Sequence, residues 1–509
     1  MINGKGRTKK DRSYTRRDFL KTIGLGASVL AMQDYSWAWA ELQKRPNILW
    51  LISEDTSPDL SCYGTGQVKT PNFDKLAAEG ARFTNAFVTA PVCSAARSAF
   101  MTGMYQTSIG VHNHRSHRLN KYTLPEPVRL LTEYFRQAGY FTCNARGLKR
   151  DRKGKTDWNF TPAGKGFDGT DWSQRASGQP FFAQVNFSLT HRVFVRDKEN
   201  PIDPAKVKLP PYYPDHPVTR RDWANYIESL QVLDSQVGKV LRRIEDEGLA
   251  DNTIVFYFGD HGRPHVRGKQ WLYEGGIHVP LIIRWPGHIK AGTTVNDLVS
   301  SIDFAPECLS LAGIEVPAHM QGKVFMGPDA KRREYVYAAR DRCDGTVDRI
   351  RCVRTKRFKY IRNFMPDRPY TQFNGYKKNY YPVLTLMAVL HKRRQLIAEQ
   401  AAFMATSRPK EELYDLQNDP YELHNLARNP EHQEILTKMR EELNRWIKDT
   451  GDMGEISEAK DTVAHEQARM QKKHEATMKK RGLSARISDE DYLKWWEEKL
   501  LATEQEKTK

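Results

Sequence analysis

Residues 47–55 read NILWLISED. The apolar run in this stretch is typical of a β-strand that is buried on both faces, as the strands of a parallel sheet are. Glu54 and Asp55 follow directly, at the carboxyl end of the predicted strand. In open α/β sheets the functional crevice lies beyond the carboxyl ends of the strands. The stretch therefore predicts a central strand of an α/β sheet, with two carboxylates at the edge of a site.

Further strands and helices alternate along the chain. The residue patterns predict helices over 71–80, 127–138, 220–247 and 302–312, strands over 81–88, 140–143, 181–187, 253–258 and 279–284, and a basic loop over 144–155. Such alternation is typical of a mostly parallel sheet with helices on both of its faces. We therefore expect the α/β fold class for this part of the chain.

The pattern changes after about residue 317. Short alternating segments predict antiparallel strands over 335–339, 350–354 and 358–361, with helices over 381–406 and 430–448. From about residue 452 the chain is rich in charge and poor in aromatic residues. We expect a catalytic α/β domain over 41–316, a smaller C-terminal α+β domain over 317–451, and a charged helical or partly disordered tail over 452–509.

The N-terminus has the features of an export signal. Thr15–Lys21 contains paired arginines, a short apolar run follows over 22–32, and Ala38-Trp39-Ala40 offers a cleavage site. The apolar run is too short to span a bilayer. Residues 1–40 are therefore predicted to be a bacterial twin-arginine signal peptide, which implies a periplasmic or secreted protein without a stable membrane anchor. The alternative is a basic amphipathic N-terminus of a cytosolic protein.

The 509 residues carry a formal net charge of +18. A basic excess of this size favours an anionic partner, such as nucleic acid, an acidic polysaccharide or a membrane surface. The positive residues are dispersed and no nucleic-acid-binding motif accompanies them, so we expect no nucleic-acid partner. The six cysteines are irregularly spaced without a CxxC pair, which argues against a zinc site. Cys343 and Cys352 are the nearest pair, but their spacing does not establish a disulfide.

Residues 90–103 read APVCSAARSAFMTG, and Cys93 stands where a helix is predicted to begin. The backbone N–H groups and the dipole of a helix N-terminus favour negative charge. Arg97, four residues later, lies on the same helix face. The pair is suited to a reactive group that handles an anion. A buried structural cysteine at the start of a helix is an equal alternative.

Acids and histidines end two of the predicted strands. Glu54 and Asp55 close the first, and Asp260 and His261 follow residues 253–258. Such oxygen-rich ligands suit calcium or magnesium better than zinc, although any one acid is more often a helix cap or a surface group. Three more residues are candidates to bind or protonate an anion: Lys155, His191 and Lys269. The residues alone indicate a crevice for a metal and an anion, without indicating a reaction.

Residues 93–97, CSAAR, resemble the signature of the type I sulfatases, which is cysteine-x-proline/alanine-x-arginine. The text at 71–77, 98–103, 281–287 and 412–416 is also similar to that family, and the resemblance covers about residues 46–427. It implies an alkaline-phosphatase-like fold and hydrolysis of sulfate from a sulfated glycan. It also implies that a formylglycine-generating enzyme oxidises Cys93 to formylglycine, whose hydrate is the nucleophile.

The resemblance assigns roles by position. Cys93, after conversion, and four other residues would bind one Ca²⁺: Glu54, Asp55, Asp260 and His261. Arg97 would hold the hydrate, Lys155 and Lys269 would clamp the sulfate oxygens, and His191 would protonate the leaving group. The sequence departs from the family pattern at Glu54, where aspartate is usual. It also departs at the second signature, glycine-lysine-x-histidine, for which residues 155–160 are the nearest counterpart.

Within the family, residues 53–55, 155–160, 262–265 and 357–363 are most similar to bacterial heparan N-sulfatase (sulfamidase)-like members. This implies N-sulfoglucosamine of heparin or heparan sulfate as the substrate. The alternatives are an O-sulfatase of another sulfated polysaccharide, a phosphoester or phosphonate hydrolase of the same superfamily, and a non-catalytic glycan-binding protein with an unconverted cysteine. His112, His114 and Arg115 are candidates to bind sugar hydroxyls or a carboxylate, or else form a surface loop.

Overall fold

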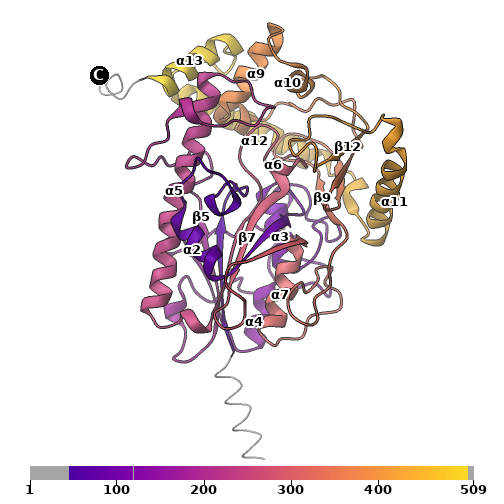
Figure 1. Ribbon diagram of the computed structural model, residues 1–509. Coiled ribbons are helices and arrows are strands. Elements are labelled where there is room, and N and C mark those ends of the chain that lie inside the picture. The colour runs from indigo at the N-terminus through magenta and orange to yellow at the C-terminus, as the bar shows by residue number, and fades with distance from the viewer. Residues whose placement is uncertain (1–44, 119, 503–509) are drawn as a thin grey trace, which may run out of the picture. The chain divides into compact units, whose positions relative to one another are not determined.

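The computed structural model describes residues 45–118 and 120–502 (Figure 1). The described residues from Pro46 onward form one compact unit. The predicted signal peptide, residues 1–40, lies outside the described residues. No helix among the described residues is long and apolar enough to cross a bilayer.

The core of this unit is an eight-stranded sheet in the order β4-β3-β5-β1-β6-β7-β2-β8. Strand β1 (Asn47–Ser53) is fully buried and pairs in parallel with β5 (Phe181–Phe187) and β6 (Thr253–Gly259). The parallel centre confirms the α/β prediction drawn from residues 47–55. The sheet is mixed, because β7 (His278–Arg284) runs antiparallel to both β6 and β2 (Ala81–Phe87). The remaining strands are β3 (Phe141–Arg146), β4 (Lys149–Lys153) and β8 (Thr293–Ser300).

Helices cover both faces of the sheet, as Figure 1 shows. Helices α2 (Pro71–Glu79) and α5 (Pro217–Asp246) pack together on one side, and α3 (Cys93–Thr102), α4 (Leu131–Gln137) and α7 (Phe304–Leu311) on the other. Trp50 of β1 makes edge contacts with Phe100 of α3 and Phe304 of α7. On β6, Phe258 joins that cluster while its neighbour Tyr257 contacts Phe73 of α2. Successive strand residues therefore anchor opposite helix layers, as the period of two requires.

A smaller antiparallel sheet follows, in the order β12-β11-β10-β9. Its strands are β9 (Val336–Arg340), β10 (Ile350–Arg354), β11 (Phe358–Asn363) and β12 (Glu411–Asp415). Helix α11 (Gln433–Asp449) packs on β10 and β11 through Leu436, Met439 and Leu443. The predicted change to short antiparallel strands is confirmed, whereas β8 and β12 were not predicted as strands. The domain boundary at 316 stays a prediction.

The tail contains two helices, α12 (Lys460–Lys480) and α13 (Asp489–Leu501). Helix α12 packs on α8 (Gly375–Tyr380), and α13 packs on α5 and α9 (Pro382–Lys392). The few apolar residues of the tail make this packing: Met470, Met478, Tyr492 and Trp496 are all buried. The boundary of the tail at 452 stays a prediction.

Two element predictions were wrong. The basic loop predicted over 144–155 is instead the end of β3 and the antiparallel edge strand β4, whose five residues are all exposed. Lysine and arginine are suited to an edge strand because they discourage further pairing. The single helix predicted over 381–406 is divided into α9 and the short α10 (Ala398–Ala402), with Arg394 in the left-handed region at φ +56° between them. The short α6 (Glu274–Ile277) precedes β7.

Candidate active site

Cys93 is the first residue of α3, as predicted, and its side chain is buried. Strand β2 leads into the loop before it, and Val92 caps the helix in an extended conformation. The Cys93 Sγ lies 3.2 Å from Nε2 of His261, which follows β6. The helix start and the carboxyl end of β6 therefore meet at one point.

The carboxylates predicted at the strand ends come together because β1 and β6 are adjacent and parallel. The backbone N–H of Asp55 donates to Oδ1 of Asp260 at 3.0 Å, and His261 Nε2 lies 3.1 Å from Oδ1 of Asp55. Asp55 adopts φ +53°, a left-handed conformation that aspartate tolerates better than most residues. Asp55, Asp260 and His261 are completely buried.

The carboxylates of Glu54, Asp55 and Asp260 each have a cationic partner. Lys269 Nζ lies 2.9 Å from both oxygens of Asp55, and Lys155 Nζ lies 2.7 Å from Oε2 of Glu54. The third pair joins Arg97 Nε to Asp260 Oδ2 at 2.9 Å. Arg97 also donates from Nη1 to Asn186 Oδ1, while its buried Nη2 has no hydrogen-bond partner among the described residues. We refer to Glu54, Asp55, Cys93, Arg97, Lys155, Asp260, His261 and Lys269 as the Cys93 cluster.

The charges of the cluster shift the pKa values of its members. Burial alone would raise the pKa of the Cys93 thiol, but Lys155, Lys269 and His261 outweigh burial and lower it. Burial opposes protonation of His261, yet Asp260, Cys93 and Asp55 raise its pKa to about 10. A thiol with a lowered pKa at a helix start is a reactive environment rather than an inert structural one.

His191 follows β5 and lies at the rim of the cluster. One of its ring nitrogens and carboxylate oxygens of Glu54 and Asp55 all lie within 4.8 Å of one another. Its Nδ1 lies 2.7 Å from the carbonyl oxygen of Arg192, so Nδ1 carries the proton and Nε2 is left for another partner. Burial and the charge of Lys269 lower the pKa of His191.

The donor set suits a hard divalent cation. Ligand atoms of Asp55, Cys93 and His261 lie within 4.8 Å of one another, and the carboxylates of Glu54 and Asp260 belong to the same cluster. Several buried carboxylates around one point are the donors that Ca²⁺ takes. The residues present therefore fit the metal that the family resemblance implies.

Asp157 lies beside the Cys93 cluster and is a candidate site residue that the sequence reasoning missed. The segment Gly154-Lys155-Thr156-Asp157 matches the second signature in its first two residues and places Asp157 where the histidine would stand. Asp157 pairs in bidentate fashion with Arg115, and its Oδ2 lies 3.8 Å from Lys155 Nζ. The Gly-Lys doublet just after β4 was the signal that could have revealed it.

Of the three candidates for sugar binding, two lie beside the Cys93 cluster and one does not. His114 Nδ1 lies 2.8 Å from Ser94 Oγ, and the backbone N–H of Arg115 donates to the same oxygen, so both residues lie beside the start of α3. His112 is buried, and the charges that act on it are those of Asp341 and Arg351 rather than those of the Cys93 cluster. The structure therefore does not bring His112 into the site.

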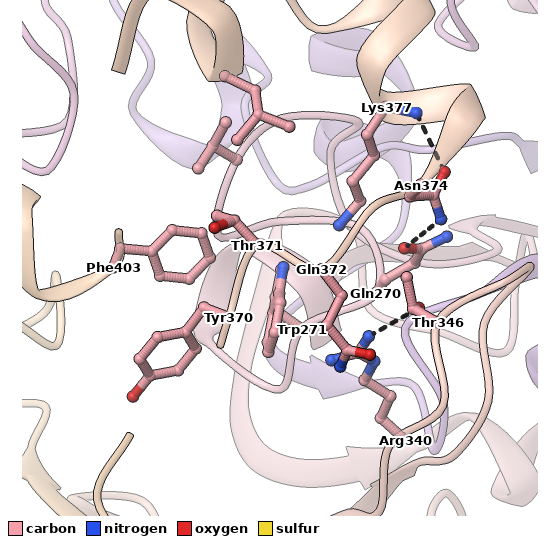
Figure 2. Close-up of a pocket in the computed structure, with 12 residues that line it drawn as sticks. Gln270, Trp271, Arg340, Thr346, Tyr370, Thr371, Gln372, Asn374, Lys377 and Phe403 are labelled. Carbon is pink, nitrogen blue, oxygen red and sulfur yellow. Dashed lines mark hydrogen bonds between the residues drawn. The ribbon is translucent and has the colours of Figure 1, made fainter. Parts of the chain in front are cut away.

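A small pocket adjoins the cluster through Gln270, the residue after Lys269 (Figure 2). Asn374 and Gln270 both donate to Asp344, whose carboxylate lies 3.7 Å from His114 Nε2. Burial, reinforced by Arg340, lowers the pKa of Lys377 in this pocket to about 7. The cavity measures only about 20 Å³, which is room for a water molecule and not for a sugar ring. All six cysteines are free thiols, so no disulfide joins Cys343 to Cys352.

Residues 46–314 match the family described as sulfatase, and residues 259–383 match the family described as N-sulphoglucosamine sulphohydrolase, C-terminal. An ulvan-active sulfatase of Formosa agariphila is 36% identical over 82% of this chain and 77% of its own length. The human N-sulphoglucosamine sulphohydrolase is 25% identical over 80% of this chain and 90% of its own.

The fold also matches solved structures. One is that of an enzyme in complex with its substrate D-glucosamine-2-N,6-O-disulfate, which has a TM-score of 0.59 at 19% identity. It covers 81% of this chain and 100% of that chain. The fold is therefore the alkaline-phosphatase-like fold that the resemblance implied. The chain belongs to the sulfatase family and is a hydrolase of sulfate esters or sulfamates.

Proposed function

We propose that this protein is an exported sulfatase that removes sulfate from a sulfated glycan, with Cys93 converted to formylglycine. The observation that carries the proposal is the position of Cys93, which is the buried first residue of α3 and lies within the Cys93 cluster. Arg97 Nη2, buried without a partner among the described residues, is free to donate to an oxygen held beside residue 93. An unconverted structural cysteine would need none of these charges.

Formylglycine would supply a hydrated aldehyde as the nucleophile toward sulfur. A Ca²⁺ ion held by Glu54, Asp55, Asp260, His261 and residue 93 would supply positive charge where negative charge develops. Lys155 and Lys269 would bind the sulfate oxygens, because both ammonium groups lie in the cluster and the raised pKa of each keeps it charged. His191 would act as the general acid in its doubly protonated form, in which Nδ1–H is donated to the Arg192 carbonyl and the proton on Nε2 passes to the leaving oxygen or nitrogen of the sugar.

Two substrate classes have support. The match of residues 259–383 to the N-sulphoglucosamine sulphohydrolase C-terminal family favours an N-sulfated glucosamine of heparin or heparan sulfate. The 36% identity to an ulvan-active sulfatase favours O-sulfate on another acidic polysaccharide. In either case, His114 and Arg115, which lie beside the start of α3, would contact the sugar.

The decisive experiment measures sulfate release from a panel of defined N- and O-sulfated saccharides, with phosphate monoesters and diesters in parallel. Release from one sulfated class, absent in the Cys93→Ala variant, supports the proposal. Faster turnover of phosphoesters than of every sulfated substrate would assign the chain to the phosphoester alternative instead.

The maturation and export steps are tested separately. We infer that a formylglycine-generating enzyme converts Cys93 before export, since the twin-arginine pathway carries folded proteins. Mass spectrometry of the peptide containing residue 93, from protein held in the cytoplasm and from the periplasmic fraction, is expected to show the aldehyde in both. Unmodified cysteine in fully active protein would overturn this mechanism.

A further inference from the structure

A groove of about 740 Å³ lies between the residues that follow His191 and the helices of the tail. Arg192, Val193 and Phe194 line one side of it, and Trp495 and Trp496 of α13 line the other. Figure 1 shows α13 beside α9 and the end of α5, in agreement with the packing of these helices. The groove therefore exists only because the tail folds back onto the catalytic sheet's outer helix.

The groove carries an excess of positive charge. Four of its lining cations have no carboxylate within ion-pair distance among the described residues: Arg221, Lys480, Arg481 and Lys499. Asp222 is the acid that lines the groove, and both of its oxygens are bound by Arg192 at 2.6 Å. The uncompensated cations create a field that favours an anionic ligand.

The groove also presents aromatic surface. The Trp495 and Trp496 rings lie 4.9 Å apart, and the Arg481 guanidinium lies 4.7 and 5.1 Å from their centroids. Trp495 is half-buried and presents part of its ring to the groove, whereas Trp496 packs behind it, and Val193 is 77% exposed. An indole ring offers an apolar face for the C–H groups of a sugar. Aromatic rings interleaved with free cations are the chemistry that binds an acidic saccharide.

The groove is linked to the proposed leaving-group side of the active site by sequence adjacency and by two ring contacts. Arg192 follows His191 directly, and the His191 ring lies 5.6 Å from Tyr376, whose ring lies 5.4 Å from that of Tyr380 at the groove. If His191 protonates the departing sugar, the rest of the glycan must extend past His191. The groove is the charged surface that such a chain would meet next.

We propose that this groove is a binding site for further residues of an anionic polysaccharide, so that the enzyme holds a sulfated or carboxylated glycan chain beyond the sugar being desulfated. The inference rests on the proposed function for the direction in which the glycan extends. It assigns the tail, residues 452–502, a role in recognising the substrate.

Binding is measured first, in the Cys93→Ala background so that no turnover interferes. Heparin and ulvan serve as probes, with affinity read by titration calorimetry at low ionic strength. The Lys480→Glu/Lys499→Glu variant changes two exposed cations of the groove and is expected to weaken binding of one polymer by at least about tenfold, the equivalent of 1.4 kcal/mol. Trp495→Ala is expected to weaken it as well.

Lys239→Glu/Arg242→Glu is the matched control, because both residues are exposed, form no ion pair among the described residues, and lie on α5 about 27 and about 32 Å along the helix from Arg221. In the active enzyme, the groove variants are expected to raise KM for the polymer while kcat/KM for a small aryl sulfate stays within about twofold of wild type. The control variant is expected to leave both unchanged.

Equal polymer affinity in the groove variant and the matched control would overturn the inference. So would loss of self-association in the Trp495→Ala variant by sedimentation, because a second copy of the chain would then be the occupant. Failure of the proposed function is distinguishable, since a wild-type enzyme that releases no sulfate from any substrate can still be scored in the binding experiment.

Discussion

Arg115 and Asp157 form a bidentate ion pair, in which Nε lies 2.9 Å from Oδ1 and Nη2 lies 2.7 Å from Oδ2. Burial would raise the pKa of the Asp157 carboxyl, but Arg115 and Lys155 lower it, so the group is ionised at neutral pH. The position at which the second signature would supply histidine therefore carries a negative charge. The guanidinium of Arg115 provides a positive charge next to it.

The Asp157→Ala variant is expected to lower kcat/KM by about 10- to 100-fold, because both Arg115 and Lys155 lose the carboxylate that orients them. Asp157→Asn, which keeps the shape and removes the charge, is expected to lie between wild type and alanine. Steady-state kinetics on the preferred saccharide provide the measurement. Asp151→Ala, on the exposed strand β4, is the control and is expected to be neutral. Full activity in Asp157→Ala would show that the pair is structural.

The Cys93→Ala variant is expected to lose at least about a thousandfold in sulfate release. Its thermal stability is expected to change little, because the substitution removes one small buried atom. Cys62→Ala changes a free cysteine outside the cluster and serves as the matched control for both measurements. Retained turnover in Cys93→Ala would contradict the assignment of the nucleophile.

Removal of the proposed Ca²⁺ ion by a chelator is expected to lower activity by at least about tenfold and to lower Tm, because a ligand bound only by the folded state adds to its stability. Readdition of Ca²⁺ is expected to restore both, with Mg²⁺ tested beside it. The Asp55→Asn variant is expected to need more Ca²⁺ for the same recovery. Full activity in protein shown by metal analysis to be free of divalent ions would rule out the proposed site.

Glu307 of α7 gives a pH-dependent stability prediction that is independent of the active site. Burial raises the pKa of this carboxyl to about 7, although the backbone N–H groups of Phe325 and Met326, which donate to Oε2, oppose the rise. In the unfolded chain the pKa of this carboxyl is about 4.3, so the folded state binds the proton more tightly. The stabilisation is complete below the unfolded pKa and is lost as pH rises through about 7.

The Glu307→Gln variant keeps an oxygen for the two N–H groups and removes the titration. Between pH 5 and pH 8 the wild type is therefore expected to lose stability relative to this variant, by up to about 3 kcal/mol. Urea unfolding at the two pH values measures the difference. Glu315→Gln, at an exposed position, is the control. Parallel pH profiles for wild type and Glu307→Gln would contradict the raised pKa.

The buried strands were predictable because their apolar runs are continuous, and a strand covered on both faces leaves little alternative. The parallel order of β1 and β6 follows from that pattern, and it brings Asp55 to Asp260. The edge hairpin of β3 and β4 was not predictable in this way, because a strand with five exposed charged residues has no apolar period. Strand β12 was missed for a related reason, since its pairing with β11 depends on a partner distant in sequence.

The candidate site residues also differ in whether they could be predicted from local sequence. Cys93, Arg97 and the strand-end acids could be placed because each is fixed by local position on a helix or a strand. The pair of Arg115 and Asp157 could not, since it joins two loops and no spacing rule relates them. The groove at α13 could not be predicted either, because its aromatic residues form a binding surface only together with Arg192 and Arg221, which are distant in sequence.

The packing of α13 has a consequence for the order in which the chain is made. Leu493 shares a buried apolar cluster with Val218 of α5 and with Leu386 and Val389 of α9. During synthesis, those three side chains emerge from the ribosome long before Leu493 does, and they stay uncovered until α13 arrives. The apolar surface that α5 and α9 share is therefore exposed on the nascent chain until α13 has been synthesised, and it is a site where the unfinished protein can aggregate.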